Sequence, residues 1–325
     1  MKPFLAAAIQ MNSQPDIKHN MDQAREAVAR AAREGARFVA LPENFAFLGS
    51  ETEKHRQAEP ISEAVLSELP KWAKQFGIWL LAGGFPVRSE PQRKSSRVFN
   101  RAAMIDPSGA IIAQYDKIHL FDVRLSDEEQ YRESDMVQPG QPGPVVCNMS
   151  LPDETSGRSG TGGKDEAGMA DVAGATDATS AAGGADATDA TITAGRTGET
   201  DATSVTIGLS ICYDLRFPEL YRRLSDSGAG VLCVPSAFTR PTGKAHWEVL
   251  LRARAVENSC YVIAPAQTGL HGKSRQTYGH SLIVDPWGAV LSDAGTEPGM
   301  AVAEIDPEHI RDVRQKLPSL RHRVL

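Results

Sequence analysis

The stretch TIGLSICYDLRFPELYRRL, Thr206 to Leu224, indicates a strand followed by a turn and a helix. Its apolar residues up to Ile211 alternate with the two-residue period of a buried strand, and Pro218 begins a segment with the apolar pattern of a first helical turn. Cys212 is therefore predicted at the carboxyl end of a strand, the edge where α/β proteins bind ligands. A nucleophile on such a turn lies beside the free N–H groups of the helix. The alternative is an inert core thiol, since free cysteine is among the most buried residue types.

The rest of the chain also alternates strands with amphipathic helices, one of them around residues 62–76. Strands are predicted at FLAAAIQM, RFVALPE, IWLLAGGF, GVLCVPSAF, CYVIAPAQ, YGHSLIVDPWGAVL and GMAVAEID, and a hairpin at VFNRAAMIDPSGAIIAQYDKIHLF. Because each predicted helix has one apolar face, two helical layers should cover a mixed β core. The pattern therefore predicts an α/β fold.

A segment at about 153–204 differs from the rest in composition. It consists largely of Ala, Gly, Thr, Asp and Ser and contains no aromatic residue. Such a segment cannot bury enough apolar surface to offset the entropy of ordering it. It is strongly acidic, so the remainder of a chain whose formal charge is −6 is nearly neutral. We predict a single domain, 1–325, interrupted by a disordered surface insertion.

Composition argues against several classes of protein. The near-neutral charge outside the insertion gives no electrostatic reason to bind nucleic acid or an anionic membrane. No apolar run approaches the roughly 18 residues of a membrane span, and the run Phe4–Ile9 is shorter than the roughly 7–15 residues of a signal-peptide core, so we expect a cytoplasmic protein. The four cysteines fit neither C-x-x-C redox spacing nor zinc spacing, and no structural metal is expected. Three of them are predicted to be core residues: Cys147, Cys233 and Cys260.

A catalytic thiol needs a base or a cation beside it, because an ordinary thiol with a pKa near 8.5 is only a few per cent ionised at neutral pH. Glu43 in ALPENF and Lys117 in YDKIHLFD each follow an apolar strand, so a carboxylate, an ammonium and the thiol could converge on one pocket. Each also has a simpler interpretation, Glu43 as a helix-start carboxylate and Lys117 as a solvated strand end. Three histidines could complete a papain-like pair, although their surroundings do not resemble that family's pattern: His119, His246 and His280.

The motifs LPENF, YDKIHLFD and GLSICYDLRFPEL, in this order, resemble the Glu, Lys and Cys motifs of the nitrilase, or carbon–nitrogen hydrolase, superfamily. The similarity covers essentially the whole chain except 153–204. It implies a four-layer α-β-β-α sandwich that commonly pairs into an α-β-β-α-α-β-β-α dimer, and hence a homodimer or higher homo-oligomer. It also implies hydrolysis of a non-peptide C–N bond in a small-molecule amide, without metal or cofactor.

Carried over to this sequence, the resemblance makes Cys212 the nucleophile and Glu43 the general base. It makes Lys117 the cation that stabilises the oxyanion, and the backbone N–H of Tyr213 is expected to help. A thioester intermediate follows from this chemistry. A further glutamate of the family aligns with Glu133 in YRESD, where it would orient Lys117 or the substrate; the alternative is a surface loop carboxylate.

Two segments in the second half, PSAFTRPTGKAHWEVLLRARAVENSCYVIAPAQTG and RQTYGHSLIVDPWG, resemble the deaminated glutathione amidase branch of the superfamily. The resemblance implies hydrolysis to 2-oxoglutarate and cysteinylglycine. The alternatives are an omega-amidase acting on 2-oxoglutaramate, or a catalytically silent interaction protein that binds through the acidic insertion. Three arginines are candidates for binding substrate carboxylates, or else purely structural: Arg216, for which an internal salt bridge is an alternative, Arg240 and Arg275.

Overall fold

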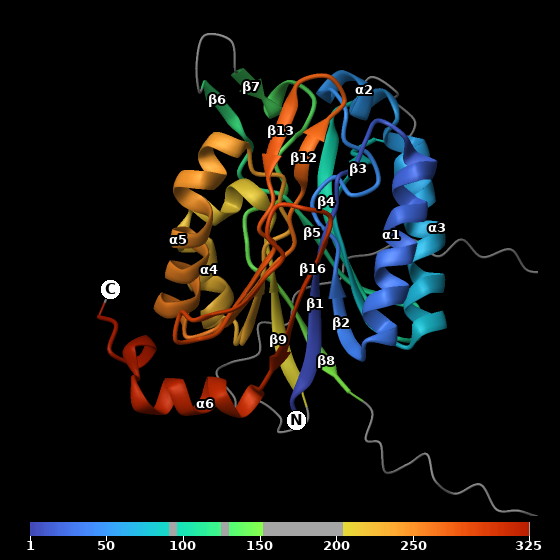
Figure 1. Cartoon of the computed structure of the whole chain (residues 1–325). Coiled ribbons are helices and arrows are strands. Elements are labelled where there is room, and N and C mark those ends of the chain that lie inside the picture. Colours follow the sequence, from blue (N-terminus) through green and yellow to red (C-terminus); the bar gives the residue numbers. More distant parts are fainter. Residues whose placement is uncertain (91–95, 125–129, 152–203, 325) are drawn as a thin grey trace, which may run out of the picture. The chain divides into compact units, whose positions relative to one another are not determined.

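Two six-stranded sheets pack face to face between two layers of helices in the computed structural model, which describes residues 1–90, 96–124, 130–151 and 204–324 (Figure 1). The described residues before position 152 and from Ser204 onward belong to one compact unit. The predicted insertion falls on 152–203, outside the described residues, except that Ser204 begins a strand.

The first sheet has the order β16-β1-β2-β3-β4-β5. Its three central strands, β1 to β3, run parallel, and the others pair antiparallel. Helices α1 (Ile17–Arg33) and α3 (Ala58–Phe76) cover its outer face (Figure 1). The strands are β1 (Phe4–Gln10), β2 (Ala36–Ala40), β3 (Trp79–Arg88), β4 (Val98–Ile105), β5 (Ile111–Asp116) and β16 (Gly299–Ile305).

The second sheet has the order β15-β14-β11-β10-β9-β8, with β9, β10 and β11 parallel. Helices α4 (Pro218–Asp226) and α5 (Arg240–Asn258) cover its outer face (Figure 1). The strands are β8 (Val145–Ser150), β9 (Ser204–Leu209), β10 (Val231–Cys233), β11 (Tyr261–Ala264), β14 (Leu282–Val284) and β15 (Val290–Asp293).

Short elements complete the described fold. They are α2 (Glu51–Arg56), α6 (Pro307–Lys316), the ribbons β6 (Asp122–Arg124) with β7 (Gln130–Arg132) and β12 (Thr268–His271) with β13 (Arg275–Tyr278), and the 3₁₀ turns η1 (Glu133–Asp135), η3 (Cys212–Arg216) and η4 (Ser319–Arg321).

The main core lies between the inner faces of the two sheets. Side chains of the first sheet, such as Phe38 and Met104, form one buried cluster with those of the second, such as Ile207 and Val262. A second cluster fills the space between the first sheet and its helices. The predicted α-β-β-α sandwich is therefore confirmed, and the three cysteines predicted to be core residues are buried in it.

Local sequence explains where individual helices begin and end. The side chain of Asp16 accepts a hydrogen bond from the backbone N–H of His19 and caps α1. Helix α3 begins at Ala58, earlier than the predicted position 62, and ends at Gly77, whose φ of 63° is in the left-handed region that glycine adopts at low cost.

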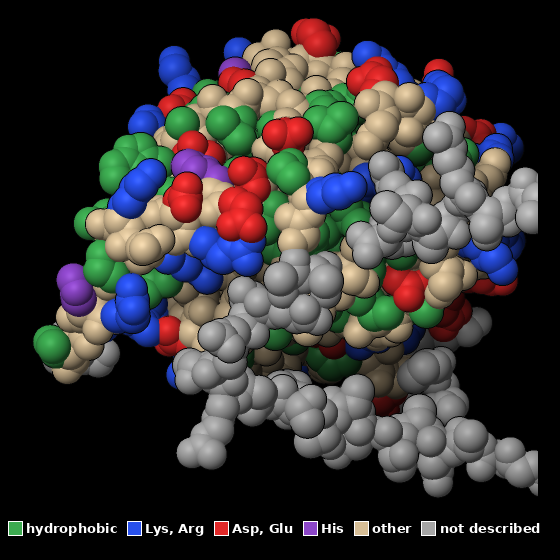
Figure 2. Space-filling view, turned by 90° about the horizontal axis from the view of Figure 1, so that it is seen from below, with side chains coloured by type: hydrophobic (Ala, Val, Ile, Leu, Met, Phe, Trp, Pro, Cys, Tyr) green, Lys and Arg blue, Asp and Glu red, His purple; other side chains and the backbone are tan. Residues whose placement is uncertain are grey.

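Charged side chains are mixed on the surface. On the face shown in Figure 2, Lys and Arg are interspersed with Asp and Glu. This mixture agrees with the near-neutral charge of the chain outside the predicted insertion.

Candidate active site

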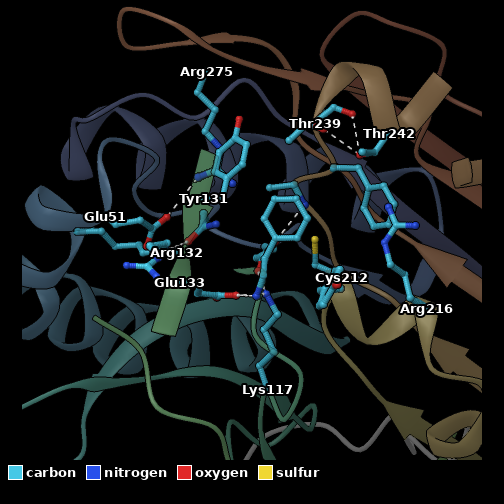
Figure 3. A pocket seen from close by; sticks show the side chains of 17 residues that line it. Glu51, Lys117, Tyr131, Arg132, Glu133, Cys212, Arg216, Thr239, Thr242 and Arg275 are labelled. Carbon is cyan, nitrogen blue, oxygen red and sulfur yellow. Dashed lines mark hydrogen bonds and ion pairs between the residues drawn. The ribbon is translucent and has the colours of Figure 1, made fainter. Parts of the chain in front are cut away.

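Three strand ends meet at one pocket. Glu43 follows β2, Lys117 follows β5 and Cys212 follows β9, and all three line the pocket. Figure 3 shows Lys117 and Cys212 among the side chains that line it. Residues far apart in the sequence converge because the two sheets face each other and carry these strand ends at the same edge. The structure thus brings together the three residues that the sequence singled out. Lys117 is buried and is not a solvated strand end, and Glu43 lies in a turn and not at the start of a helix.

Cys212 is held on a strained turn. Its φ of 49° is in the left-handed region, which is costly for a residue with a Cβ atom and persists where the surroundings enforce it. Its backbone N–H donates to the Pro235 carbonyl at 3.0 Å, and the Asp214 carboxylate accepts from Ile211 N–H at 2.9 Å. The turn therefore presents the thiol at the pocket, as a nucleophile requires.

Asp214 also ties this turn to the segment that carries Lys117. The buried carboxylate accepts hydrogen bonds from Tyr115 Oη at 2.7 Å and from His119 Nδ1 at 2.7 Å, and these two residues flank Lys117. The distance between the ammonium and the thiol is thereby constrained by side chains on both segments.

Glu43 is only 3% exposed and is surrounded by donors. Its Oε2 accepts from the Ala237 backbone N–H at 3.0 Å, while Oε1 accepts from Asn100 Nδ2 at 2.8 Å and from Lys117 Nζ at 3.3 Å. With Oε1 occupied by two donors and Oε2 by one, Oε2 has the capacity left to accept a proton from the thiol.

Lys117 is only 2% exposed and forms ion pairs with two carboxylates, Glu133 Oε2 at 2.8 Å and Glu43 Oε1 at 3.3 Å. Burial alone would lower the pKa of the ammonium, but the Glu133 and Glu43 carboxylates outweigh it and raise that pKa well above its ordinary value. Lys117 is therefore a permanent cation, suited to stabilising an oxyanion.

Glu133 is buried, so it is not the surface loop carboxylate that the sequence left open. Its Oε2 accepts from Phe121 N–H at 2.7 Å as well as from Lys117. Burial favours the protonated carboxyl and would raise its pKa. The positive charges of Lys117 and then Lys54 outweigh this effect and lower the pKa of Glu133 from 4.5 to about 2. Its anion holds Lys117 in place.

The Cys212 thiol stays protonated at neutral pH. Burial, and then the neighbouring Glu43 carboxylate, raise its pKa well above the ordinary value of 9.0, and Lys117 offsets only part of this. A resting thiolate is thus disfavoured, so the proton has to move to a base as the thiol attacks. Glu43 lines the same pocket and acts on the thiol electrostatically, so it is placed to take that proton.

None of the three candidate histidines pairs with the thiol within the described part of the chain. His119 bonds to Asp214, His246 Nδ1 lies 3.2 Å from Arg216 Nη1, and His280 pairs with Asp293. A papain-like arrangement is therefore not formed.

The three candidate arginines are placed differently. Arg216 lines the pocket (Figure 3). Its guanidinium lies over the rings of Tyr213 and Phe238, at 5.7 and 5.4 Å from their centroids. It has no carboxylate partner among the residues that the structure describes, so the salt bridge considered for it is not present. Arg275 also lines the pocket and pairs with Glu51 at 3.3 Å. The structure does not bring Arg240 to the pocket, because it donates to Gln276 at the exposed start of α5.

Several buried polar residues at the site were missed from the sequence, among them Lys54 and Asn100. Lys54, on α2, lines the pocket and pairs with Glu51 at 2.7 Å. Asn100, in β4, donates to Glu43. Asn100 interrupts an apolar strand pattern, which is a signal that could have been used, whereas Lys54 has the ordinary setting of an exposed helix residue.

Two further findings concern metal ions and membranes. Over the described ranges, no three His, Cys, Asp or Glu residues are grouped so that they could hold a metal ion. Across the same ranges, no helix has the length and apolar character that crossing a membrane demands.

The same family emerges from comparison with known proteins. The carbon–nitrogen hydrolase family matches residues 5–315. A deaminated glutathione amidase from Synechocystis sp. is 45% identical over 324 residues, covering 100% of this chain and 99% of that protein. The crystal structure of Caenorhabditis elegans NitFhit is similar with a TM-score of 0.76 and 33% identity, covering 100% of this chain and 66% of that one. Saccharomyces cerevisiae Nit3, a member of branch 10 of the nitrilase superfamily, gives a TM-score of 0.71 at 27% identity, covering 98% of this chain and 95% of that one. This chain therefore belongs to the carbon–nitrogen hydrolase family, within the nitrilase superfamily.

Proposed function

We propose that this hydrolase cleaves the amide bond of deaminated glutathione and releases 2-oxoglutarate and cysteinylglycine. The observation that carries the proposal is the charge of the pocket. Among the described residues that line it, five are cationic and three are carboxylates, and deaminated glutathione carries two carboxylates and no ammonium. The residues are Lys54, Lys117, Arg132, Arg216 and Arg275 against Glu43, Glu51 and Glu133. Relatives that bear the name deaminated glutathione amidase support the same substrate.

Catalysis proceeds through the thiol. Glu43 takes the proton of Cys212 as the sulfur attacks the amide carbonyl, and Lys117 with the N–H of Tyr213 stabilises the oxyanion. The intermediate collapses with breakage of the C–N bond, and Glu43 passes the proton to the departing amine. Water then attacks the thioester, Glu43 accepts a proton from that water, and the thiol regains a proton as 2-oxoglutarate leaves.

Arg216 is the candidate for binding a substrate carboxylate. The rings of Tyr213 and Phe238 hold its guanidinium at the pocket without neutralising it. A guanidinium can donate two parallel hydrogen bonds to a carboxylate. Among the described residues of the pocket, by contrast, the α-ammonium of intact glutathione finds no free acid, because Glu51 and Glu133 are already paired with cations and Glu43 serves as the base.

A competition experiment tests the proposal. Deaminated glutathione, 2-oxoglutaramate and glutathione are offered at equal low concentration and kcat/KM is measured for each. We expect deaminated glutathione to be preferred to 2-oxoglutaramate, because the cysteinylglycine part adds binding energy usable in the transition state. We expect it to be preferred to glutathione by roughly 10² or more, because an unpaired ammonium is costly to desolvate.

Variants locate the carboxylate site. Arg216→Gln should lower kcat/KM for both 2-oxo substrates by roughly 10², the cost of a lost charged hydrogen bond. Arg240→Gln, outside the pocket, is the matched control and should behave as wild type.

In the competition experiment, a preference of the wild type for 2-oxoglutaramate would instead favour an omega-amidase, and a preference for intact glutathione would contradict both assignments.

Two further proposals concern the setting of the enzyme. We infer from composition that it acts in the cytoplasm, and the family resemblance supports a homodimer or higher homo-oligomer. Sedimentation equilibrium at micromolar concentration tests the second proposal, and a monomer would contradict it.

A further inference from the structure

The amide of Asn100 lies between two carboxylates of the site. Its Nδ2 donates to Glu43 Oε1 at 2.8 Å and to Glu133 Oε1 at 3.3 Å, and the residue is buried. Its Oδ1 has no hydrogen-bond partner among the described residues. Only this orientation of the amide offers donors to the two anions, because an amide oxygen in the same place would repel them.

The backbone of β3 leaves room for this amide. A Cβ atom at Gly84 would lie 2.2 Å from Asn100 Oδ1 and 3.0 Å from Glu43 Cγ, so only glycine fits. The strand is irregular at this point, with a register shift between Ala82 and Phe85. Asn100 Oδ1 is therefore buried without a hydrogen-bond partner among the described residues, while the NH₂ group of Asn100 faces the Glu43 and Glu133 carboxylates.

Asn100 and Lys117 form a ring of contacts with the two glutamates. The ammonium bridges the same pair, Glu133 at 2.8 Å and Glu43 at 3.3 Å, and the Lys117 backbone N–H donates to the Asn100 carbonyl at 2.9 Å. The carboxylates of Glu43 and Glu133 therefore share one charged donor, the Lys117 ammonium, and one neutral donor, the Asn100 amide. Removing the neutral donor would leave the ammonium as the single side chain that bridges both carboxylates.

We propose that Asn100 is a positioning residue for the amide hydrolysis: its amide holds the Glu43 carboxylate turned so that Oε2 remains available to the Cys212 thiol. The inference rests on the proposed role of Glu43 as the base. Asn100 does not line the pocket, so it acts through Glu43 and not on the substrate.

Charged and titratable groups surround Glu43. It faces Lys117 from the end of β5, Cys212 from η3 and Arg275 from β13. Without the Asn100 donor, Oε1 of Glu43 would keep Lys117 as its one hydrogen-bond donor among the described residues, and the orientation of the carboxylate would be held less firmly.

The experiment compares kcat and KM for wild type, Asn100→Ala and, as the matched control, Asn148→Ala in the exposed part of β8. We expect Asn100→Ala to lower kcat roughly 10- to 100-fold, the range for a hydrogen bond to a charged group, with KM nearly unchanged. Asn148→Ala should match wild type.

A second variant separates positioning from folding. Asn100→Ser keeps a small donor, so it should retain more activity than Asn100→Ala, and it replaces that variant if Asn100→Ala does not fold. A loss that lies in KM, or an Asn100→Ser variant no more active than a folded Asn100→Ala variant, would overturn the proposal. The measurement uses whichever of deaminated glutathione and 2-oxoglutaramate the wild type hydrolyses, so a failure of the proposed substrate is seen separately in the wild type.

Discussion

Glu133 offers a direct test of the electrostatics of the site. Its carboxylate is buried, pairs with Lys117 at 2.8 Å and accepts the Phe121 N–H at 2.7 Å. Glu133→Gln keeps the shape and a hydrogen-bond acceptor but removes the charge, so it imitates the protonated carboxyl. The substitution therefore isolates what the charge contributes to the free energy of unfolding.

The magnitude follows from the pKa of Glu133, which folding lowers from 4.5 to about 2. Each pKa unit corresponds to about 1.4 kcal/mol, so the ionised carboxylate contributes about 3 kcal/mol to the free energy of unfolding at neutral pH. Because the pKa in the folded state is the lower one, this contribution is fully present above about pH 4.5. It is lost as the pH falls toward 2.

Urea unfolding of wild type and Glu133→Gln, measured between pH 7 and pH 3, checks this expectation. We expect Glu133→Gln to be less stable by about 3 kcal/mol at pH 7 and the gap to narrow below about pH 4.5. Glu63→Gln, an exposed position on α3, is the matched control and should change stability by less than about 0.5 kcal/mol.

Two results would refute the reasoning. If Glu133→Gln were as stable as Glu63→Gln at pH 7, the carboxylate would not be held ionised by Lys117. If the gap stayed constant down to pH 3, the loss would come from packing and not from the charge.

The remaining predictions concern the thiol and the predicted insertion. Cys212→Ala and Cys212→Ser should abolish turnover, whereas Ala at each of the three core cysteines, Cys147, Cys233 and Cys260, should retain it. Peptide mapping after inactivation with iodoacetamide checks which cysteine is modified. Inactivation that follows modification of another cysteine would contradict the assignment. Replacing 155–203 with a short Gly/Ser linker should leave melting temperature and kcat/KM nearly unchanged, because Ser150 and Ser204 are antiparallel partners that a short loop can join, and loop closure depends only weakly on length. A large loss of either quantity in calorimetry or turnover would count against a dispensable segment.

Much of the fold and the centre of the site followed from the sequence, because they depend on local patterns. Alternating apolar residues before Cys212, and the proline after it, are sufficient to predict a strand, a turn and a helix. Glu43 and Lys117 each stand at the end of an apolar run, but that pattern left simpler interpretations open, and the resemblance of their motifs to the family assigned them to the site. The sandwich itself followed from one-sided helices between strands, together with the family resemblance of three motifs.

Tertiary structure alone decided which polar residues surround Glu43, Lys117 and Cys212. Lys54 and Asn100 became part of the site because α2 and β4 pack beside it, and Glu133 proved buried where a surface loop had been an alternative. The sequence ranked Arg216 and Arg240 alike, yet only Arg216 reaches the pocket. The physical reason is that burial and charge pairing depend on contacts between distant segments, and periodicity within one segment carries no information about those contacts.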